Sequence, residues 1–575
     1  MAQVAAASTI RTARRVPSRG ILLFAIVVAV GFFTAYPVSL LLLRSFQVSA
    51  PGDALQWGLS GWTSAFGDDA LVKAFANTLF LGSVRTGITL VLAIYFAWIV
   101  TRTNTPMRGF IEFMMWLGFF LPAIPMTMGW ILLLDPFSGV LNTFLRDRLG
   151  IDSPFNIYSY GGIIWAHLAF STSIRFLLLT PAFRSMDAAL EEAGRIAGNN
   201  SLQVLRRVTI PVLAPAIIIG TSLGFIKSLE SLEIELLLGR RAEISVFTTR
   251  IFDYLHWEPP LYGRATALSS IFLLVIFLMI WLQRIVIGKR HYTTVTGRGY
   301  RAGVNDIGGW RWVTFGTSML FIGVMIILPL CMLLMGTFMR LSGLFDIPDP
   351  WTFKHWTAAF DDPVFIRSLR NTLIMGFGAA TFGAVVYALI AYMIVRGRFL
   401  GRGLLDFFAW LPWAIPGVLV SLSLLWVFLG SGPIFKQVYG TIFILIIATT
   451  IGTLPLGVQI LKASVMQMSP ELEEASRVHG ASWFRTVTRI AAPLMAPAIM
   501  SVGIISFISA IRDVPTVIFL ANFQTRPLSL LMLDYIIGGE REKATVIGVF
   551  LAGLIVIVAL AGRKIGLQMG NSENR

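Results

Sequence analysis

Two stretches of the chain are near copies of each other: Leu190-Glu-Glu-Ala-Gly-Arg-Ile-Ala-Gly198 and Leu472-Glu-Glu-Ala-Ser-Arg-Val-His-Gly480. Thirteen residues after the last glycine, each stretch is followed by a proline, Pro211 or Pro493. The match extends further, because 13 of the 32 residues in 186–217 are identical in 468–499 without a gap. The chain therefore contains an internal repeat, and this segment is its best-preserved part.

The sequence around these stretches is strongly apolar. The 575 residues are 56% hydrophobic and only 13% charged, whereas soluble domains carry about 25% charged residues. Apolar runs of the ~20 residues that a helix needs to cross a bilayer recur along the chain. The pattern predicts an all-α polytopic membrane protein with about twelve membrane helices, at 21–43, 77–100, 110–134, 160–181, 208–228, 265–287, 312–337, 371–395, 404–429, 440–462, 490–511 and 545–562.

Shorter matches show that the repeat covers both halves of the chain. Trp62-Thr-Ser-Ala-Phe66 recurs as Trp356-Thr-Ala-Ala-Phe360, and Asn77-Thr-Leu79 recurs as Asn371-Thr-Leu373 at the same spacing. Ala123-Ile-Pro125 recurs as Ala414-Ile-Pro416. Six helices per half is an even number, so we expect two parallel six-helix repeats related by an axis near the membrane normal. The predicted units are a tail 1–20, a first repeat 21–287, a linker 288–311, a second repeat 312–562 and a tail 563–575.

The distribution of charge predicts which loops are cytoplasmic. The net charge is +16, but the basic residues are spread over short loops, which is typical of cytoplasmic loops and does not indicate nucleic-acid binding. Basic residues without matching acids follow the second and eighth helices and fill the linker: Arg102, Arg108, Arg396, Arg398, Arg402, Arg284, Lys289, Arg290, Arg298, Arg301 and Arg311. Arg11, Arg14, Arg15 and Arg19 precede a run too long for a signal peptide. We expect both termini and the duplicated segment in the cytoplasm.

The duplicated segment has the features of a short helix. Glu191 and Arg195 are four residues apart, as are Glu473 and Arg477, which favours an exposed helix with paired charges. Gly198 and Gly480 are expected to end these helices. The next helices are expected to start near Pro211 and Pro493, where a missing N–H costs least. Two equally placed copies on one side of a membrane indicate two equivalent partners.

The motif resembles the signature of binding-protein-dependent ABC importer permeases. Glu192-Ala193-Gly194 with Gly198 and Pro211 fits that signature, as does Glu474-Ala475-Ser476 with Gly480 and Pro493; the third position, Val208 and Ala492 depart from it mildly. The resemblance implies the type I importer permease fold. It also implies coupling helices that sit in clefts of two cytoplasmic ATPase subunits, and an external or periplasmic solute-binding protein.

The chain shows no ATPase motif of its own. A phosphate-binding loop requires Gly-x-x-x-x-Gly-Lys-Ser/Thr, but Gly288-Lys289 is followed by Arg290, and position 283 is Gln. We therefore expect no catalytic residues and no cofactor on this chain, with ATP and Mg bound by the partner subunits. The five histidines are scattered, and Cys331 is the single cysteine, so no metal site built from these residues is expected.

Two further segments are candidates for an outer gate. Arg512-Asp-Val-Pro-Thr-Val517 resembles the segment after the eleventh helix of ferric-iron type permeases, and Glu230-Ser-Leu-Glu-Ile-Glu235 resembles its counterpart more loosely. We expect them where the fifth and eleventh helices reach the outer face; the gate candidates are Glu230, Glu233, Arg512, Asp513, Pro515 and Thr516. The alternative is ordinary solvated loop charge. Arg85 and Arg175 lie inside predicted helices and face either the pathway or, by snorkelling, an interface.

The resemblance predicts a multi-pass permease subunit in a bacterial cytoplasmic membrane, embedded in the lipid bilayer. A fused double permease of this length resembles the ferric-iron type, so iron(III) is the expected cargo. Thiamine, phosphonate, polyamine or sugar phosphate are the alternatives. A secondary transporter would need coupling acids in mid-membrane, and a membrane enzyme would need clustered acids and histidines. The predicted spans show no such acids, and the one acidic cluster, 230–235, lacks a neighbouring histidine.

Overall fold

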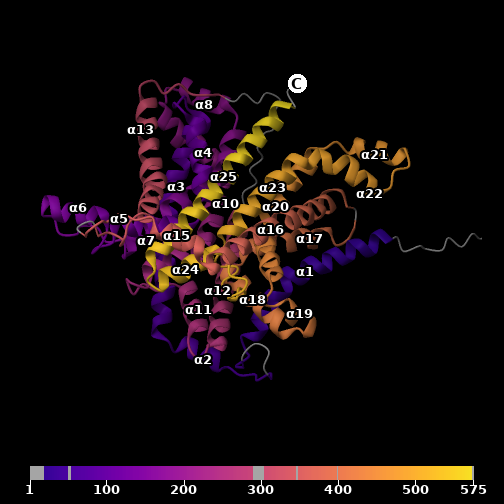
Figure 1. Ribbon diagram of the computed structural model, residues 1–575. Coiled ribbons are helices and arrows are strands. Elements are labelled where there is room, and N and C mark those ends of the chain that lie inside the picture. The colour runs from indigo at the N-terminus through magenta and orange to yellow at the C-terminus, as the bar shows by residue number, and fades with distance from the viewer. Residues whose placement is uncertain (1–17, 50–53, 289–302, 345–346, 398, 573–575) are drawn as a thin grey trace, which may run out of the picture.

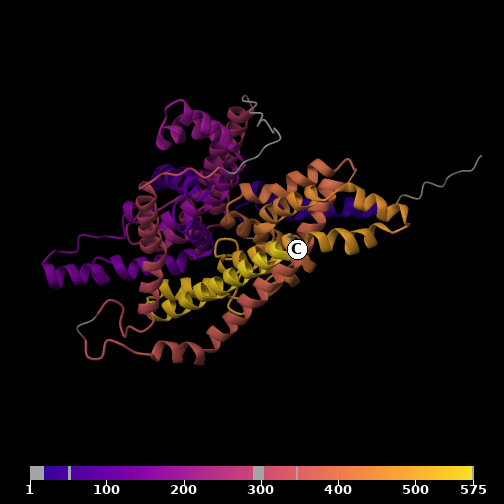
Figure 2. The ribbon, with the colours of Figure 1, turned by 90° about the horizontal axis from the view of Figure 1, so that it is seen from above.

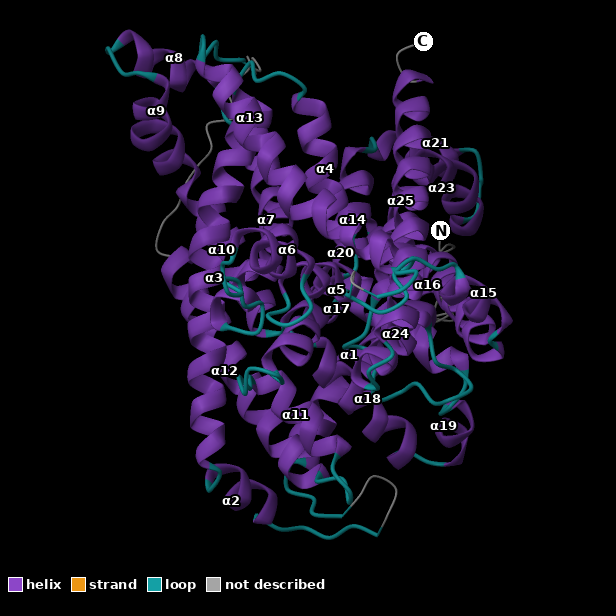
Figure 3. Cartoon of the chain, turned by 60° about the vertical axis from the view of Figure 1, so that its left-hand side comes forward, coloured by secondary structure: helices purple, strands orange, loops and turns teal. Residues whose placement is uncertain are grey.

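The computed structural model describes residues 18–49, 54–288, 303–344, 347–397 and 399–572 (Figure 1). Within these residues the chain is made of helices and loops, and strand pairing is limited to three isolated bridges (Figure 3). The N-terminal tail up to residue 17, with Arg11, Arg14 and Arg15, lies outside the described residues. So do the linker residues 289–302, Arg398 and the last three residues of the C-terminal tail.

The helices occur in the same order in both halves, which confirms the repeat. The first half contains α1 (Ser18–Arg44), α2 (Ser60–Phe66), α3 (Asp69–Arg102), α4 (Arg108–Phe120), α5 (Ala123–Leu134), α6 (Val140–Leu149), α7 (Tyr160–Ser185), α8 (Ala188–Ile196), α9 (Ser201–Val204), α10 (Ile210–Leu229), α11 (Phe247–His256) and α12 (Tyr262–Gly288). The second contains α13 (Trp310–Ile322), α14 (Leu328–Gly336), α15 (Lys354–Asp361), α16 (Pro363–Arg396), α17 (Arg402–Trp410), α18 (Gly417–Gly430), α19 (Pro433–Val438), α20 (Ile442–Gln467), α21 (Pro470–Val478), α22 (Trp483–Thr486), α23 (Ala492–Arg512), α24 (Leu528–Ile537) and α25 (Arg541–Ser572).

Ten helical segments are long and apolar enough to span a membrane, and two further spans are bent. The pair α4–α5 bends by 99°, and the pair from Arg402 to Gly430 bends by 115°. The membrane helices predicted at 110–134 and 404–429 are therefore each divided by a bend into two helices. Pro122 and Pro416 stand immediately before the second helix of each pair in extended backbone, where a proline supplies no N–H to continue a helix.

Each bent pair crosses the bundle once. In the first half, Tyr160 Oη donates to Asn77 Oδ1 at 2.8 Å near the starts of α7 and α3. Arg102 Nε donates to the Phe183 carbonyl at 3.0 Å near their ends. The helices α3 and α7 are therefore parallel, and the chain between them has to return across the bundle. The second half repeats this geometry, because Tyr387 and Arg396 of α16 donate to the carbonyls of Thr450 and Met468 in the same chain order, so the described part of the chain makes twelve crossings.

The two repeats interlock instead of standing side by side. The first helix of the first repeat, α1, packs against α17 and α18 of the second; Figure 2 shows it in indigo among the orange helices. In the same way α14 packs against α5 of the first repeat. At that crossing a Cβ on Gly129 would lie 2.1 Å from the Pro329 carbonyl oxygen. The backbones thus approach as closely as only glycine permits.

The duplicated segments lie on one side of the bundle, here called the coupling face. The helices α8 and α21 directly follow the parallel helices α7 and α20, and α1 begins and α25 ends on the same side. In Figure 1 α8 is at the top and α21 at the right, with the C-terminus between them. The short helices α2 and α6 lie at the bottom and the left, on the opposite face.

Candidate functional site: two coupling segments and a central cavity

The duplicated segments form short helices that end as expected. In α8 the Asp187 side chain caps the first turn by accepting from Ala189 N at 3.0 Å, and in α21 Ser469 takes this role. Gly198 has φ +86° and Gly480 has φ +75°, the left-handed conformation that glycine adopts readily after a helix. A Cβ at either glycine would meet no atom of the chain within 4 Å, so backbone conformation alone demands glycine here.

The first glutamate of each motif is buried, which corrects the expectation of an exposed ion pair in the first copy. Glu191 is 1% exposed. Its carboxylate accepts from Thr209 Oγ1 at 2.8 Å and from Asn305 Nδ2 at 3.0 Å, not from Arg195. Asn305 belongs to the linker and also donates its backbone N–H to the Arg102 carbonyl at 2.8 Å. The end of the linker thus holds the first coupling helix to the bundle.

In the second copy the expected pairing is present but is one of several contacts. Glu473 is 3% exposed and lies 3.6 Å from Arg477 Nη2. Its carboxylate also lies 3.0 Å from Arg396 Nε and accepts from Tyr392 Oη at 2.8 Å. The two motif glutamates therefore anchor their helices to the bundle, although their partners differ. The glutamates that stay exposed are Glu192 and Glu474.

Arg102 and Arg396 join α3 and α16 to the coupling segments, although the sequence predicted that both are loop charges. Arg102 is 2% exposed, and its guanidinium donates to the carbonyls of Phe183 and Met186. Arg396 donates to the carbonyls of Val465 and Met468 in the same way. Cations satisfy the free carbonyls at a helix C-terminus. Arg102 and Arg396 occupy equivalent positions in the two repeats, and this was the signal in the sequence that could have predicted their shared role.

Each coupling segment presents the same exposed apolar side chains. Three pairs of equivalent side chains have similar exposed fractions. Leu190 and Leu472 are 45% and 48% exposed, Ile196 and Val478 are 88% and 85% exposed, and Leu202 and Phe484 are 60% and 70% exposed. These six residues are named the coupling patches. Exposed apolar groups at matching places mark interaction surfaces. Their equivalent places in the two copies of the motif were the signal in the sequence that could have identified them.

The prolines of the motif are the second residues of α10 and α23, as predicted, but helical turns continue before them. Continuous helical segments run over Ser201–Leu229 and Trp483–Arg512. Each contains a π-helical turn, Leu205–Thr209 or Val487–Ala491, just before Pro211 or Pro493. A π-helical turn accommodates the missing N–H bond of the proline. The predicted helix starts at 208 and 490 were therefore about seven residues too late.

The six gate candidates line one cavity between the repeats. This central cavity has a volume of about 330 Å³, and residues of both halves line it, including Glu230, Glu233, Arg512, Asp513, Pro515 and Thr516. It lies deeper than the expected outer face, because Arg85, also in its wall, stands near the middle of the 34-residue α3. The helix ending at Leu229 starts far out on the coupling face, at Ser201, and so ends in mid-bundle.

The charged gate candidates are not solvated loop residues. None of them is exposed. Lys227 Nζ lies 2.8 Å from Glu230 Oε2, and Asp513 Oδ1 accepts from Thr516 N at 2.9 Å. The Arg512 guanidinium donates to the Phe119 carbonyl and stands 5.0 Å from the centre of the Phe119 ring. Their role as a gate remains a prediction.

A buried polar cluster of the first repeat borders the same cavity. Arg85 and Arg175 are each 1% exposed, so neither snorkels to an interface. Arg85 Nη1 and His167 Nε2 lie 3.1 and 3.0 Å from Glu235 Oε1. One histidine and one carboxylate do not make a metal site, and the described residues contain no group of three or more His, Cys, Asp or Glu that could hold a metal ion.

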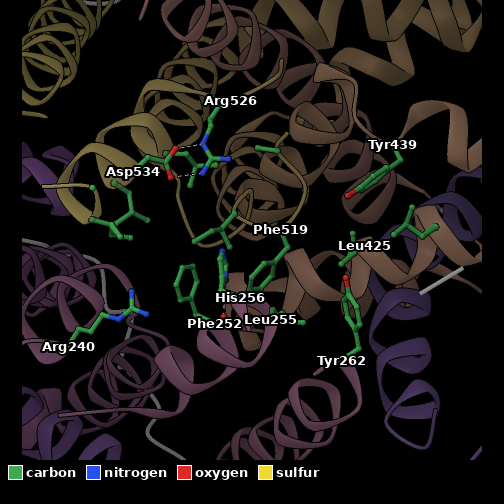
Figure 4. Close-up of a pocket in the computed structure, with 17 residues that line it drawn as sticks. Arg240, Phe252, Leu255, His256, Tyr262, Leu425, Tyr439, Phe519, Arg526 and Asp534 are labelled. Carbon is green, nitrogen blue, oxygen red and sulfur yellow. Dashed lines mark hydrogen bonds and ion pairs between the residues drawn. The ribbon is translucent and has the colours of Figure 1, made fainter. Parts of the chain in front are cut away.

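A second cavity opens nearer the opposite face (Figure 4). It has a volume of about 580 Å³ and is lined by both repeats. Tyr262 faces it from the start of α12 and Tyr439 from the end of α19, and Arg526 pairs with Asp534 on its wall (Figure 4). His256 stacks on Phe252 with ring centres 3.8 Å apart. The sequence analysis did not identify this cavity, because its residues are far apart in the chain.

Comparison with known proteins places the chain among transport permeases. Residues 379–565 match the family described as binding-protein-dependent transport system inner membrane component. A putative ferric transport system permease protein, FbpB 1, of Haemophilus influenzae is 30% identical over 514 residues, covering 88% of this chain and 78% of the relative. The ferric transport system permease protein FbpB of Actinobacillus pleuropneumoniae is 28% identical, covering 94% of this chain and 76% of the relative.

A shorter match is to a permease named for a different substrate. The sulfate transport system permease protein CysT of Salmonella typhimurium is 28% identical over 218 residues, covering 36% of this chain and 74% of the relative. This relative has the length of one repeat, whereas the ferric relatives match across both. The two-repeat architecture is thus shared with the ferric relatives.

Proposed function

Because this chain belongs to the binding-protein-dependent transport system inner membrane components, we propose that it is the iron(III) permease of an ABC importer and couples to two separate ATPase subunits. Both repeats together form the path, and the coupling patches receive the ATPases. The observation that carries this proposal is the duplication of the patches: each of the two coupling segments presents three apolar side chains at equivalent positions with similar exposure, two on its first short helix and one on the next.

The geometry of these segments suits the transmission of force. Each coupling helix is tied to the bundle through a buried glutamate and through an arginine bound to the preceding carbonyls. A push on the patches therefore moves α3 and α7, or α16 and α20, together with the coupling helix. Residues of α3, α7 and α20 line the central cavity, so closure of the ATPases changes the shape of that cavity.

The coupling face is the cytoplasmic face in this proposal. The helix α1 begins on that side and α25 ends there, and the exposed arginines Arg108 and Arg402 begin the helices that leave it. Positive charge in short loops is typical of the cytoplasmic side. The opposite face, with the second cavity, then receives solute from an external or periplasmic binding protein.

Iron(III) is the proposed cargo because the relatives that match most of this chain carry ferric transport names. Hard oxygen ligands suit such a cation, and the carboxylates of Glu233 and Asp513 face the central cavity. The partial match to sulfate permeases supports a second candidate, an oxyanion cargo.

The proposal is tested by expressing tagged chain with its neighbouring genes and measuring co-purification and ATP-driven uptake of ⁵⁵Fe(III) in proteoliposomes. The variant Ile196→Asp with Val478→Asp changes side chains that are almost fully exposed, so the fold is retained. We expect loss of the ATPase subunits and of uptake. Leu400→Asp, also fully exposed on the coupling face, is the matched control and should transport normally. Normal uptake in the double variant would refute the coupling role.

A further inference from the structure

One cation in the wall of the central cavity has no carboxylate partner. Arg175 is 1% exposed, and no carboxylate oxygen of the described residues lies within 4.0 Å of its nitrogens. Its guanidinium donates to three neutral oxygens: the Ser171 carbonyl at 3.0 Å, Thr86 Oγ1 at 2.8 Å and Ser228 Oγ at 3.2 Å. Its Nε has no hydrogen-bond partner. A buried charge without a counter-charge is expensive to keep, above all in mid-membrane.

The neighbouring cations do have negative partners. Arg85 pairs with Glu235 at 3.1 Å and Lys227 pairs with Glu230 at 2.8 Å. Arg512 interacts electrostatically with both Glu233 and Asp513. Among the arginines and lysines that line the cavity within the described residues, Arg175 alone has no negatively charged partner.

The second repeat lacks this cation, although it keeps the helices that carry it. The position equivalent to Arg175 is Gly457, and the position equivalent to Ser228 is Ala510. The Tyr387 side chain fills that space, since a Cβ on Gly457 would lie 2.2 Å from its ring. In the second repeat, Gly457 and the Tyr387 ring thus fill the space that Arg175 occupies in the first repeat. Packing alone therefore does not require the arginine.

The arginine is also given room by its surroundings. A Cβ on Gly224 would lie 2.9 Å from Arg175 Nε and 3.0 Å from Cζ. The missing side chain of Gly224 in α10 thus leaves room for the guanidinium, beside Ser171 and Ser228 in the cavity wall. The volume of about 330 Å³ equals roughly ten water molecules in bulk, which is ample for a small oxyanion.

We infer that Arg175, with the Ser228 hydroxyl, forms a binding position for a solute anion, namely a small oxyanion or carboxylate, in the central cavity. A guanidinium suits such groups because it is a permanent cation whose N–H groups form charge-assisted hydrogen bonds, and the Nε–H of Arg175 has no partner among the described residues. The anion has two possible sources: a free oxyanion such as sulfate or phosphate, or the anionic ligand of an iron(III) complex. The inference does not depend on iron being the cargo.

The inference is tested by equilibrium dialysis of the full chain, purified with whatever subunits accompany it. One arm uses ³⁵S-sulfate and ³²P-phosphate in iron-free, low-salt buffer, and the other uses ⁵⁵Fe(III)–citrate. Saturable binding of sulfate or phosphate assigns the anion as free, whereas binding of ferric citrate alone assigns it as a ligand of iron. In either case we expect Arg175→Met to weaken binding of the anion about 10- to 100-fold, because loss of a charge-assisted contact has an effect of this size.

Two glycine variants keep the test decisive if Arg175→Met does not fold. Gly224→Ala keeps the charge but displaces the guanidinium, and we expect weakened binding with normal size-exclusion behaviour. Gly87→Ala, on α3 where a Cβ meets nothing within 4 Å, should bind like the unmodified chain. Absence of saturable binding in both arms, or equal binding by the unmodified chain and folded Arg175→Met, would overturn the inference; so would equal binding by Gly224→Ala.

Discussion

The anchoring of the first coupling helix allows a quantitative prediction for Glu191→Ala. The substitution removes two hydrogen bonds, from Thr209 Oγ1 at 2.8 Å and from Asn305 Nδ2 at 3.0 Å, and leaves both donors in a buried site. An unsatisfied buried group costs about 1–3 kcal/mol, and the Thr hydroxyl can rotate to another acceptor, so the total is about 2–4 kcal/mol. This loss falls on the attachment of α8 and not on the membrane helices.

The assay is amide hydrogen exchange of residues 188–198 in the full chain. A local loss of 2–4 kcal/mol raises the opening equilibrium about 30- to 1,000-fold, while exchange in α7 stays unchanged. Glu192→Ala, one residue away and exposed, is the matched control and should leave exchange as it is. Unchanged exchange in Glu191→Ala, or an equal increase in Glu192→Ala, would refute the anchoring role of the buried carboxylate.

Two other substitutions test the architecture. Arg396→Met should lower ATP-driven uptake severalfold, because the α20 carbonyls and Glu473 lose their cation, whereas the exposed Arg402→Met should leave uptake unchanged; equal uptake by both would contradict this role. Gly129→Ala should abolish recovery of monodisperse protein in size exclusion, because its Cβ would lie 2.1 Å from the Pro329 carbonyl oxygen, and the expected cost exceeds about 3 kcal/mol. Gly316→Ala, where a Cβ meets nothing within 4 Å, should behave normally, and a well-folded Gly129→Ala would refute the close crossing.

The repeat and the number of crossings were predictable because they depend on local signals. Apolar runs, duplicated motifs and helix-ending glycines can each be recognised within a short segment of the sequence. The parallel relation of the halves followed from an even count of helices, and the structure supports it because both coupling segments lie on the same face of the bundle (Figure 1). The bends were missed because Leu121-Pro122 and Pro416 were treated as part of one apolar run.

The contacts of the coupling motif were not predictable, because they depend on residues far away in the sequence. Asn305 lies more than a hundred residues from Glu191, and Arg396 and Tyr392 lie some eighty residues from Glu473. Spacing of four residues suggested a surface ion pair in both copies, and the structure shows one only in the second. The partners of Arg175 likewise come from three different helices, so the absent counter-charge could be recognised only after folding.

The measurement that tests the central claim most directly is site-specific crosslinking at the coupling patches. Cys331→Ser removes the single cysteine, after which Ile196→Cys and Val478→Cys each place one thiol on a patch, with Leu400→Cys as the control on the same face. The account predicts that a short thiol-to-amine crosslinker joins positions 196 and 478, but not 400, to an ATPase subunit expressed with the chain. Crosslinking at neither patch in a complex that transports iron(III) with ATP would contradict it.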